Sequence, residues 1–178
     1  GDLDLYVNRN NADKYLRNDG GLRFSAQPLR LPSSGLYSTG VQAVAQIHWV
    51  GDQEATWHPH DGLPTVVPAM LNLGLSGQPY VTHDIAGFSG GPSSKELFMR
   101  WVELGAFTPI MRTHEGAAKL ENWSWEKDQE TTEHFRRFAT IHEVLAPELR
   151  DLADEAGTSS MPIARHMMLQ FPDDEETW

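Results

Sequence analysis

The chain has 178 residues, of which 39% are hydrophobic, enough to build one domain with a sizeable core. Its formal net charge of −11 would repel phosphate backbones and anionic lipids, so we expect neither nucleic acid nor a membrane surface as a partner. The absence of cysteine excludes disulfide scaffolds, thiolate nucleophiles and cysteine-ligated metal sites. No apolar run approaches the roughly 20 residues that span a bilayer, and the first residues lack a basic region followed by an apolar one, so we expect no retained signal peptide.

From residue 22 onward, strand-like segments alternate with helix-like ones. The strand-like segments are 22–31, 43–50, 79–82 and 106–111, and 161–171 is a further strand or extended segment. Apolar residues recur at helical spacing over 63–75, 97–105 and 129–156. This order favours parallel β/α units.

Capping and breaking residues mark the helices. Asp61 is a candidate N-cap for the first helix, in which Pro68 could introduce a kink. The run Ser93-Ser94-Lys95-Glu96 has the pattern of a capping box, and Pro147 should break or bend the last helix.

Charged and hydrogen-bonding residues follow three successive strand-like segments. They are Gly51-Asp52, His83-Asp84 and Arg112-Thr113-His114. The carboxyl ends of parallel strands share one rim in β/α architectures, so these side chains are expected to converge on a ligand.

Four segments occur in an order and spacing that are similar to those of a known family: WVGD, GLSGQPYVTHDIAGF, FTPIMRTH and FPDDEETW. Over roughly residues 30–178 they resemble the catalytic barrel of glycoside hydrolase family 31, the retaining α-glucosidases, α-xylosidases and their relatives. The resemblance implies a TIM (β/α)8 barrel that cleaves α-glycosidic bonds of a carbohydrate substrate with retention, using two aspartates and no metal or organic cofactor.

Residue by residue, the resemblance makes Asp52 the general acid/base. The residues that it implies bind the sugar are Arg30, Trp49, Asp84, Phe88, Arg112 and His114. A retaining mechanism needs one carboxylate as nucleophile and a second, about 5–5.5 Å away, that protonates the leaving oxygen and then deprotonates water. Trp49 and Trp57 bracket Asp52 and could supply the low-dielectric wall that keeps such an acid protonated.

The family's nucleophile motif, of the type WxDxNE or MEDFGE, has no match in the chain, and residues 1–21 do not resemble it. We therefore expect the chain to be the second half of one catalytic barrel, about strands 5–8, running out at 165–178 toward a C-terminal β domain. On this interpretation the chain alone would lack the covalent step. Two unpaired sheet edges would favour a homo-oligomer or domain swapping.

An α-glucoside is the first expectation for the substrate. Gln53, the run His114-Glu115-Gly116 and the pair Asn122-Trp123 are similar to the sulfoquinovosidase branch instead. That branch resembles DIGGY, with a tyrosine that helps to bind the sulfonate, whereas this chain has Phe88, which cannot donate that hydrogen bond.

Each candidate also has a purely structural interpretation. Asp52 could be a turn or N-cap aspartate, His114 a core histidine, Arg112 an ion-pair partner, and Trp49 and Phe88 core filling. Two other functions stay open at this point: an inactive half-barrel that is only structural or sugar-binding, and a metal-dependent barrel hydrolase using His58, His60, His83 and Asp84.

Overall fold

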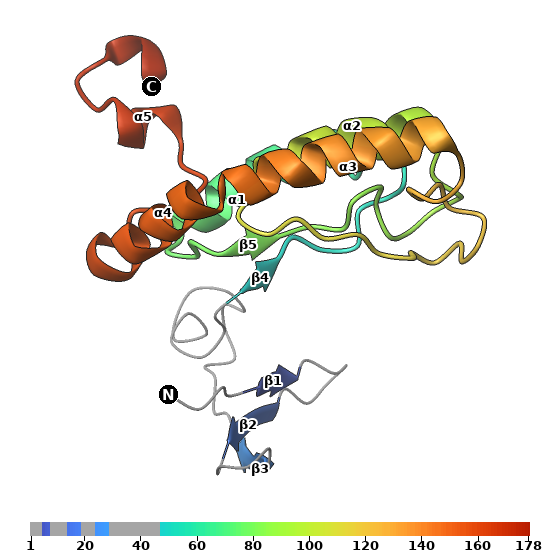
Figure 1. The fold of residues 1–178 in the computed structure, drawn as a ribbon. Helices are drawn as coiled ribbons and strands as arrows, with labels where there is room; N and C mark the ends of the chain where they lie inside the picture. The colour runs from blue at the N-terminus through green and yellow to red at the C-terminus, as the bar shows by residue number, and fades with distance from the viewer. Residues whose placement is uncertain (1–4, 8–13, 19–23, 29–46) are drawn as a thin grey trace. The chain divides into compact units, whose positions relative to one another are not determined.

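The structure is a computed structural model that describes residues 5–7, 14–18, 24–28 and 47–178. The chain divides into two compact units, Gly1–Gln46 and Ile47–Trp178 (Figure 1).

The described part of the first unit is an antiparallel sheet of β1 (Leu5–Val7), β2 (Lys14–Asn18) and β3 (Phe24–Pro28), in the order β1-β2-β3. Leu16 of β2 lies opposite Leu5 on one side and Ala26 on the other. The strand expected over 22–31 is therefore present as β3, but the expectation of a parallel unit is wrong for this segment. The connections 8–13 and 19–23 are shorter than the dozen or so residues that a parallel crossover requires.

The second unit begins with a parallel β/α unit. Strands β4 (His48–Trp49) and β5 (Val81–Thr82) pair in parallel, and between them the chain forms a 3-10 turn, η1 (Leu63–Thr65), and the helix α1 (Val66–Leu75). The N-cap of α1 is Thr65 and that of η1 is Gly62, so the prediction of Asp61 as a cap is wrong.

A third segment continues the parallel arrangement on the other side of β5. Thr82 pairs with Ile110 and Ile85 with Thr113 through isolated parallel bridges. The strand expected over 106–111 is otherwise absent, because Ala106 caps the preceding helix and the Thr108 hydroxyl donates a hydrogen bond to Gly105 O. The chain thus delivers residues 110–113 beside β5 without forming a regular strand.

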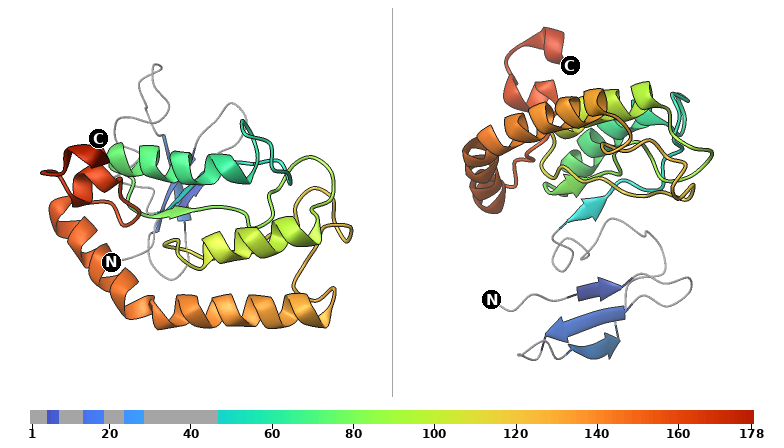
Figure 2. Two further views of the ribbon diagram at one scale, coloured as in Figure 1. Left: turned by 90° about the horizontal axis from the view of Figure 1, so that it is seen from above. Right: turned by 45° about the vertical axis from the view of Figure 1, so that its right-hand side comes forward.

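The remaining helices are α2 (Lys95–Gly105), α3 (Gln129–Val144), α4 (Ala146–Ser159), α5 (Met167–Gln170) and η2 (Glu175–Thr177). The N-cap of α2 is Ser94, whose hydroxyl accepts from Leu97 N, one residue later than a box that starts at Ser93 would require. The expected break of the last helix is confirmed: α3 ends and α4 begins at Leu145, with Pro147 in the first turn of α4, and the axis bends there (Figure 2).

The extended segment expected over 161–171 is wrong in its second half, where α5 forms. Pro162 packs against Gly74 of α1, and Arg165 Nη2 donates a hydrogen bond to Glu155 Oε2 of α4 at 2.6 Å. These contacts hold the segment against helices, and no strand of residues 47–178 pairs with it.

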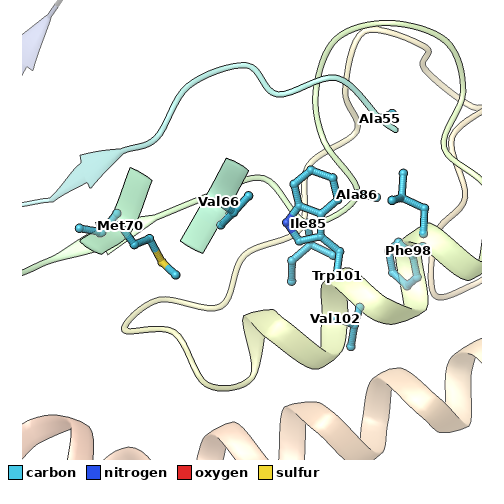
Figure 3. Packing of buried hydrophobic residues seen from close by; sticks show 10 residues of the cluster. Ala55, Val66, Met70, Ile85, Ala86, Phe98, Trp101 and Val102 are labelled. Atoms are coloured by element: carbon cyan, nitrogen blue, oxygen red, sulfur yellow. The ribbon is translucent and has the colours of Figure 1, made fainter. Parts of the chain in front are cut away.

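The core of the second unit lies between α1, α2 and the parallel segments (Figure 3). Trp101 and Val102 of α2 are fully buried and pack with Ile85, which follows β5, and with Val66 of α1. The helices lie on one side of the two strands (Figures 1 and 2), so the carboxyl ends of the strands are held in place by helices on that side. Within the described ranges, no helix combines the length and apolar character needed to cross a membrane.

Candidate active site

Asp84, two residues after β5, is the centre of the candidate site. Its side chain is buried, with 1% of its surface exposed. Trp49 Nε1, from the end of β4, donates a hydrogen bond to Asp84 Oδ2 at 3.2 Å. Arg112, from the third parallel segment, donates from Nη2 to the other carboxylate oxygen and forms an ion pair with it. Side chains from three parallel segments therefore meet at one carboxylate, as the order of the strand ends predicts.

Burial dominates the electrostatics of Asp84 and raises the pKa of its carboxyl group above the ordinary value. The charges of Arg112 and His114 and the hydrogen bond from Trp49 act in the opposite direction, and the negative charge of Asp52 adds a smaller increase to the pKa. Asp52 and His114 are thus close enough to Asp84 for their charges to be felt there.

Asp52 is exposed and follows Gly51, whose φ of +112° is a conformation that glycine adopts readily. Its loop is joined by backbone hydrogen bonds to the loop after β5. Gln53 O accepts from Phe88 N at 2.8 Å and from Ser89 N at 3.1 Å, and the Ser89 hydroxyl donates to Asp52 O at 2.8 Å. The position of the Asp52 backbone is therefore set by the neighbouring loop.

Gly87 makes this close approach of the two loops feasible. A Cβ at Gly87 would lie 2.8 Å from Ala55 N and 2.8 Å from Ala55 Cα, closer than such atoms approach, and the residue has a φ of +81°. Ala86, immediately before it, also has a positive φ of +75° although it carries a side chain. The tight turn at 86–87 thus brings the Asp52 loop against the loop that carries Asp84.

Phe88 and His114 contact each other edge to face, with ring centroids 5.1 Å apart and an interplanar angle of 69°. His114 Nδ1 accepts a hydrogen bond from Gly116 N at 2.9 Å, so in the neutral ring the proton is on Nε2. His114 is exposed, and its Nε2 is available as a donor to a ligand.

His83 is a residue whose role the motif alone did not indicate. It is fully buried, and its Nδ1 accepts a hydrogen bond from Trp101 Nε1 of α2 at 3.0 Å. Burial, with a smaller contribution from the charge of Arg112, lowers the pKa of His83 to about 4. The neutral imidazole thereby fixes the chain next to Asp84 against α2. In the sequence, Trp101 follows Leu97 by one helical turn in an apolar pattern. This pattern marks Trp101 as a buried helix residue and could have indicated that it contacts the end of β5.

Asn122 is a second residue whose role the motifs did not indicate. Its Nδ2 donates to Glu115 O and its Oδ1 accepts from Ser93 N at 2.9 Å, so it ties the loop that carries His114 to the start of α2. Gly116 leaves the space, because a Cβ there would lie 2.5 Å from Asn122 Nδ2.

The tryptophans behave differently from the expectation. Trp49 donates its indole hydrogen to Asp84 and not to Asp52, and Trp49 and Trp57 are 47% and 48% exposed. Because Asp52 is itself exposed, these two rings do not enclose it within residues 47–178. Arg30 lies outside the described residues.

The four residues of the metal-hydrolase alternative do not form a ligand set. His83 is buried with Nδ1 bonded to Trp101, whereas His58 and His60 are exposed and contact each other in the loop before α1. Among the described residues, no cluster of three or more histidine and carboxylate side chains has the geometry to hold a metal ion.

Parallel segments whose carboxyl ends carry the polar side chains, with the helices on the outer side, are the architecture of a TIM barrel. Comparison with known proteins agrees. Residues 34–152 match the model of the Glycosyl hydrolases family 31 TIM-barrel domain. The chain belongs to glycoside hydrolase family 31.

Its relatives include glycosidases of different specificity. The chain is 40% identical to the sulfoquinovosidase of Agrobacterium fabrum over 143 residues, which are 79% of this chain and 22% of that protein. It is 35% identical to the lysosomal alpha-glucosidase of Rattus norvegicus over 131 residues, 74% of this chain and 13% of the relative. The chain thus spans about a fifth or less of the length of these relatives.

A solved structure is similar over three quarters of the chain. The family 31 sulfoquinovosidase of E. rectale, determined in complex with an aza-sugar inhibitor, superposes with a TM-score of 0.72 at 33% identity, over 75% of this chain and 20% of that structure.

Proposed function

We propose that the chain is the second half of the catalytic barrel of a retaining α-glycosidase, with Asp52 as the general acid/base. The observation that carries the proposal is the position of Asp52: its exposed carboxylate follows β4 and lies within electrostatic reach of the buried, doubly bonded carboxylate of Asp84. The motif WVGD and the family membership support the same role for this residue.

In the proposed reaction, Asp52 protonates the glycosidic oxygen while a nucleophilic aspartate attacks the anomeric carbon. Asp52 then removes a proton from the water that hydrolyses the glycosyl-enzyme intermediate. The nucleophile comes from outside this chain, since its motif has no match here. Asp52 is exposed within residues 47–178, so on this proposal the surroundings that keep it protonated near neutral pH come from other parts of the barrel.

The proposed glycone site consists of Asp84, Arg112 and His114, with Phe88 and Trp49 as apolar walls. Asp84 accepts from Trp49 at one oxygen and from Arg112 at the other, so the buried carboxylate holds these two side chains in place at the site. The Phe88 ring holds the His114 ring edge to face, which orients Nε2. Fixed donors and acceptors beside aromatic rings match a sugar, which presents hydroxyl groups at its rim and C–H groups on its faces.

An α-glucoside is the first proposed substrate class, and a sulfoquinovoside is the second. The sulfoquinovosidase relatives, at 40% identity, favour the second, as do Gln53, Glu115 and Asn122. Phe88 favours the first, because its ring contacts His114 and offers no hydroxyl group to a sulfonate.

The proposed half-barrel predicts self-association. Ile47 and Trp49, at the start of the second unit, are 56% and 47% exposed, as expected of a barrel segment that lacks its neighbour. Light scattering of the 178-residue chain should therefore show a dimer or larger assembly, and a monomer that binds no apolar dye would contradict the half-barrel interpretation.

The catalytic role of Asp52 is tested in the complete protein to which this chain belongs. Asp52→Asn should abolish hydrolysis of unactivated glycosides but partly spare the first step with aryl glycosides, measured as a burst of released aglycone, because a good leaving group needs no protonation to depart. Asp61→Asn, which changes an exposed aspartate of the same loop, is the matched control. An equal loss on both substrates would exclude Asp52 as the acid.

A further inference from the structure

Residues 51–53 form a short bulge between two points at which the chain pairs with its neighbours. Before the bulge, Val50 N donates a hydrogen bond to Thr82 O of β5 at 3.1 Å. After it, Glu54 pairs with Ser89 through an isolated parallel bridge. The bulge lies between these two pairings, so the way it folds decides where its carboxylate points.

The side chain of Gln53 closes the bulge from within. Gln53 is 6% exposed, whereas Asp52 before it is exposed. Gln53 Nε2 donates a hydrogen bond to Val50 O at 2.9 Å, and thereby joins the two ends of the bulge. Gly51 lies between the bonded groups, with the positive φ that glycine adopts readily. The amide is therefore buried beneath the bulge while the carboxylate of Asp52 reaches solvent.

This side-chain bond complements the backbone bonds to the neighbouring loop. Those bonds hold Asp52 O and Gln53 O, which follow the Cα atom that carries the carboxylate. The bond from Gln53 Nε2 holds Val50 O, which precedes that Cα atom. With the chain tied on both sides of Asp52, backbone rotations that would swing its carboxylate away are opposed.

The net stability that Gln53 contributes is small. Its Oε1 is buried and has no hydrogen-bond partner among the described residues. The burial of an unpaired acceptor offsets what the bond of Nε2 to Val50 O contributes to stability. Stability therefore gives little reason for a glutamine at this position, whereas the shape of the bulge does.

We propose that Gln53 is a positioning residue for the general acid/base, and that its side-chain amide holds the bulge so that the carboxylate of Asp52 faces the glycosidic oxygen. This role rests on the proposed function of Asp52 and deepens it. Because Gln53 acts through Asp52, its loss should weaken the steps that need a proton and spare those that need none.

The variant Gln53→Met in the complete protein tests this role, because methionine keeps the length of the buried side chain and lacks the amide. It should lower kcat for unactivated glycosides about tenfold. This loss lies between about fivefold, for one hydrogen bond, and about a hundredfold, for a catalytic group misplaced by about 1 Å. KM should stay unchanged, and so should the rate of the burst of aglycone from aryl glycosides with good leaving groups, which depart without protonation.

Gln78→Met is the matched control. Gln78 is also a buried glutamine, 3% exposed, and lies between α1 and β5. A general weakening of the fold would slow both kinds of substrate. Gln53→Met therefore refutes the positioning role if it slows both kinds equally or slows neither, or if Gln78→Met reproduces its selective loss.

Asp52→Asn, assayed beside these variants, separates this inference from the proposed function. If Asp52→Asn discriminates between the two kinds of substrate and Gln53→Met does not, the inference fails and the proposed function stands. If Asp52→Asn does not discriminate, both fail.

A measurement on the unsubstituted 178-residue chain needs no variant to fold. By NMR, the Nε2 protons of Gln53 should exchange with solvent more slowly than those of a free glutamine, because the amide is buried and bonded. Exchange at the rate of a free glutamine would show that the bulge is not closed in this way and would overturn the inference.

Discussion

Replacing His83 with asparagine should flatten the dependence of folding stability on pH between pH 7 and pH 5. In the folded chain burial lowers the pKa of His83 from 6.5 to about 4, whereas the unfolded chain retains the ordinary value. Between these two values the unfolded state binds more protons than the folded state, so stability falls as the pH falls. Acidification from pH 7 to pH 5 should cost about 2 kcal/mol through this one residue.

Other groups contribute to the same curve. Burial also lowers the pKa of His48, which adds a loss of the same sign on acidification. The pKa of Asp84 is raised, so this carboxyl group is protonated more readily in the folded than in the unfolded state, and its contribution opposes the loss once the pH falls into its range. Only a variant that removes His83 alone can separate its part.

Urea unfolding at pH 7 and pH 5 measures the effect. Asparagine keeps an acceptor near the position of Nδ1, so the hydrogen bond from Trp101 can be retained. His60→Gln, which removes an exposed histidine, should leave the dependence unchanged. The NMR titration of His83 in the wild-type chain is an independent readout, and a titration midpoint near 6.5 in the folded chain would refute the reasoning.

Three further predictions concern the loops and the helix that form the site. Gly87→Ala should destabilise the fold by about 2–4 kcal/mol in thermal unfolding, because its Cβ would clash with the Ala55 backbone. Gly77→Ala is the control: Gly77 has a φ of +79° and no atom within 4 Å of the added Cβ, so this variant should cost only the backbone strain of about 1 kcal/mol. Ser94→Ala should cost about 1 kcal/mol by urea unfolding, since α2 loses its capping hydroxyl. Asp84→Asn should abolish detectable binding of methyl α-glucoside by NMR without unfolding the chain, and unchanged binding would exclude Asp84 from the site.

The positions of the helices follow from local signals that the sequence displays openly. Capping residues and Pro147 act within one or two turns of the chain, so the start of α2 and the break between α3 and α4 could be predicted to within a residue or two. The structure of segments 106–111 and 161–171 was harder to predict, because an apolar run becomes a strand only where a neighbouring strand offers it hydrogen bonds. In residues 47–178 the first segment pairs at Ile110 alone, with a second bridge beyond it at Thr113, and α5 forms in the second segment.

Residues of the candidate site that belong to a sequence motif could be predicted. Residues that are distant in sequence and contact the site only in the folded chain were much harder to predict. Because the carboxyl ends of parallel strands share one rim, the sequence predicts that Asp84 and Arg112 lie together, and their ion pair is present. The ion pair also fits the interpretation of Arg112 as a purely structural partner. Trp101 and Asn122 lie 18 and 29 residues away from the groups that they bond, His83 and Ser93. A local pattern can therefore mark Trp101 as a buried helix residue, but it does not show which group either residue bonds. Asp52 is exposed within residues 47–178, although Trp49 and Trp57 bracket it in the sequence.

The backbone bonds between residues 53–55 and 87–89 have a practical consequence for engineering. A designer who transplants the Asp52 loop into another barrel would have to transplant the 84–90 loop with it, since Gly87 provides the clearance that Ala55 needs. Libraries that randomise one of the two segments alone would mostly displace Asp52, whereas libraries that vary both together would keep its backbone position.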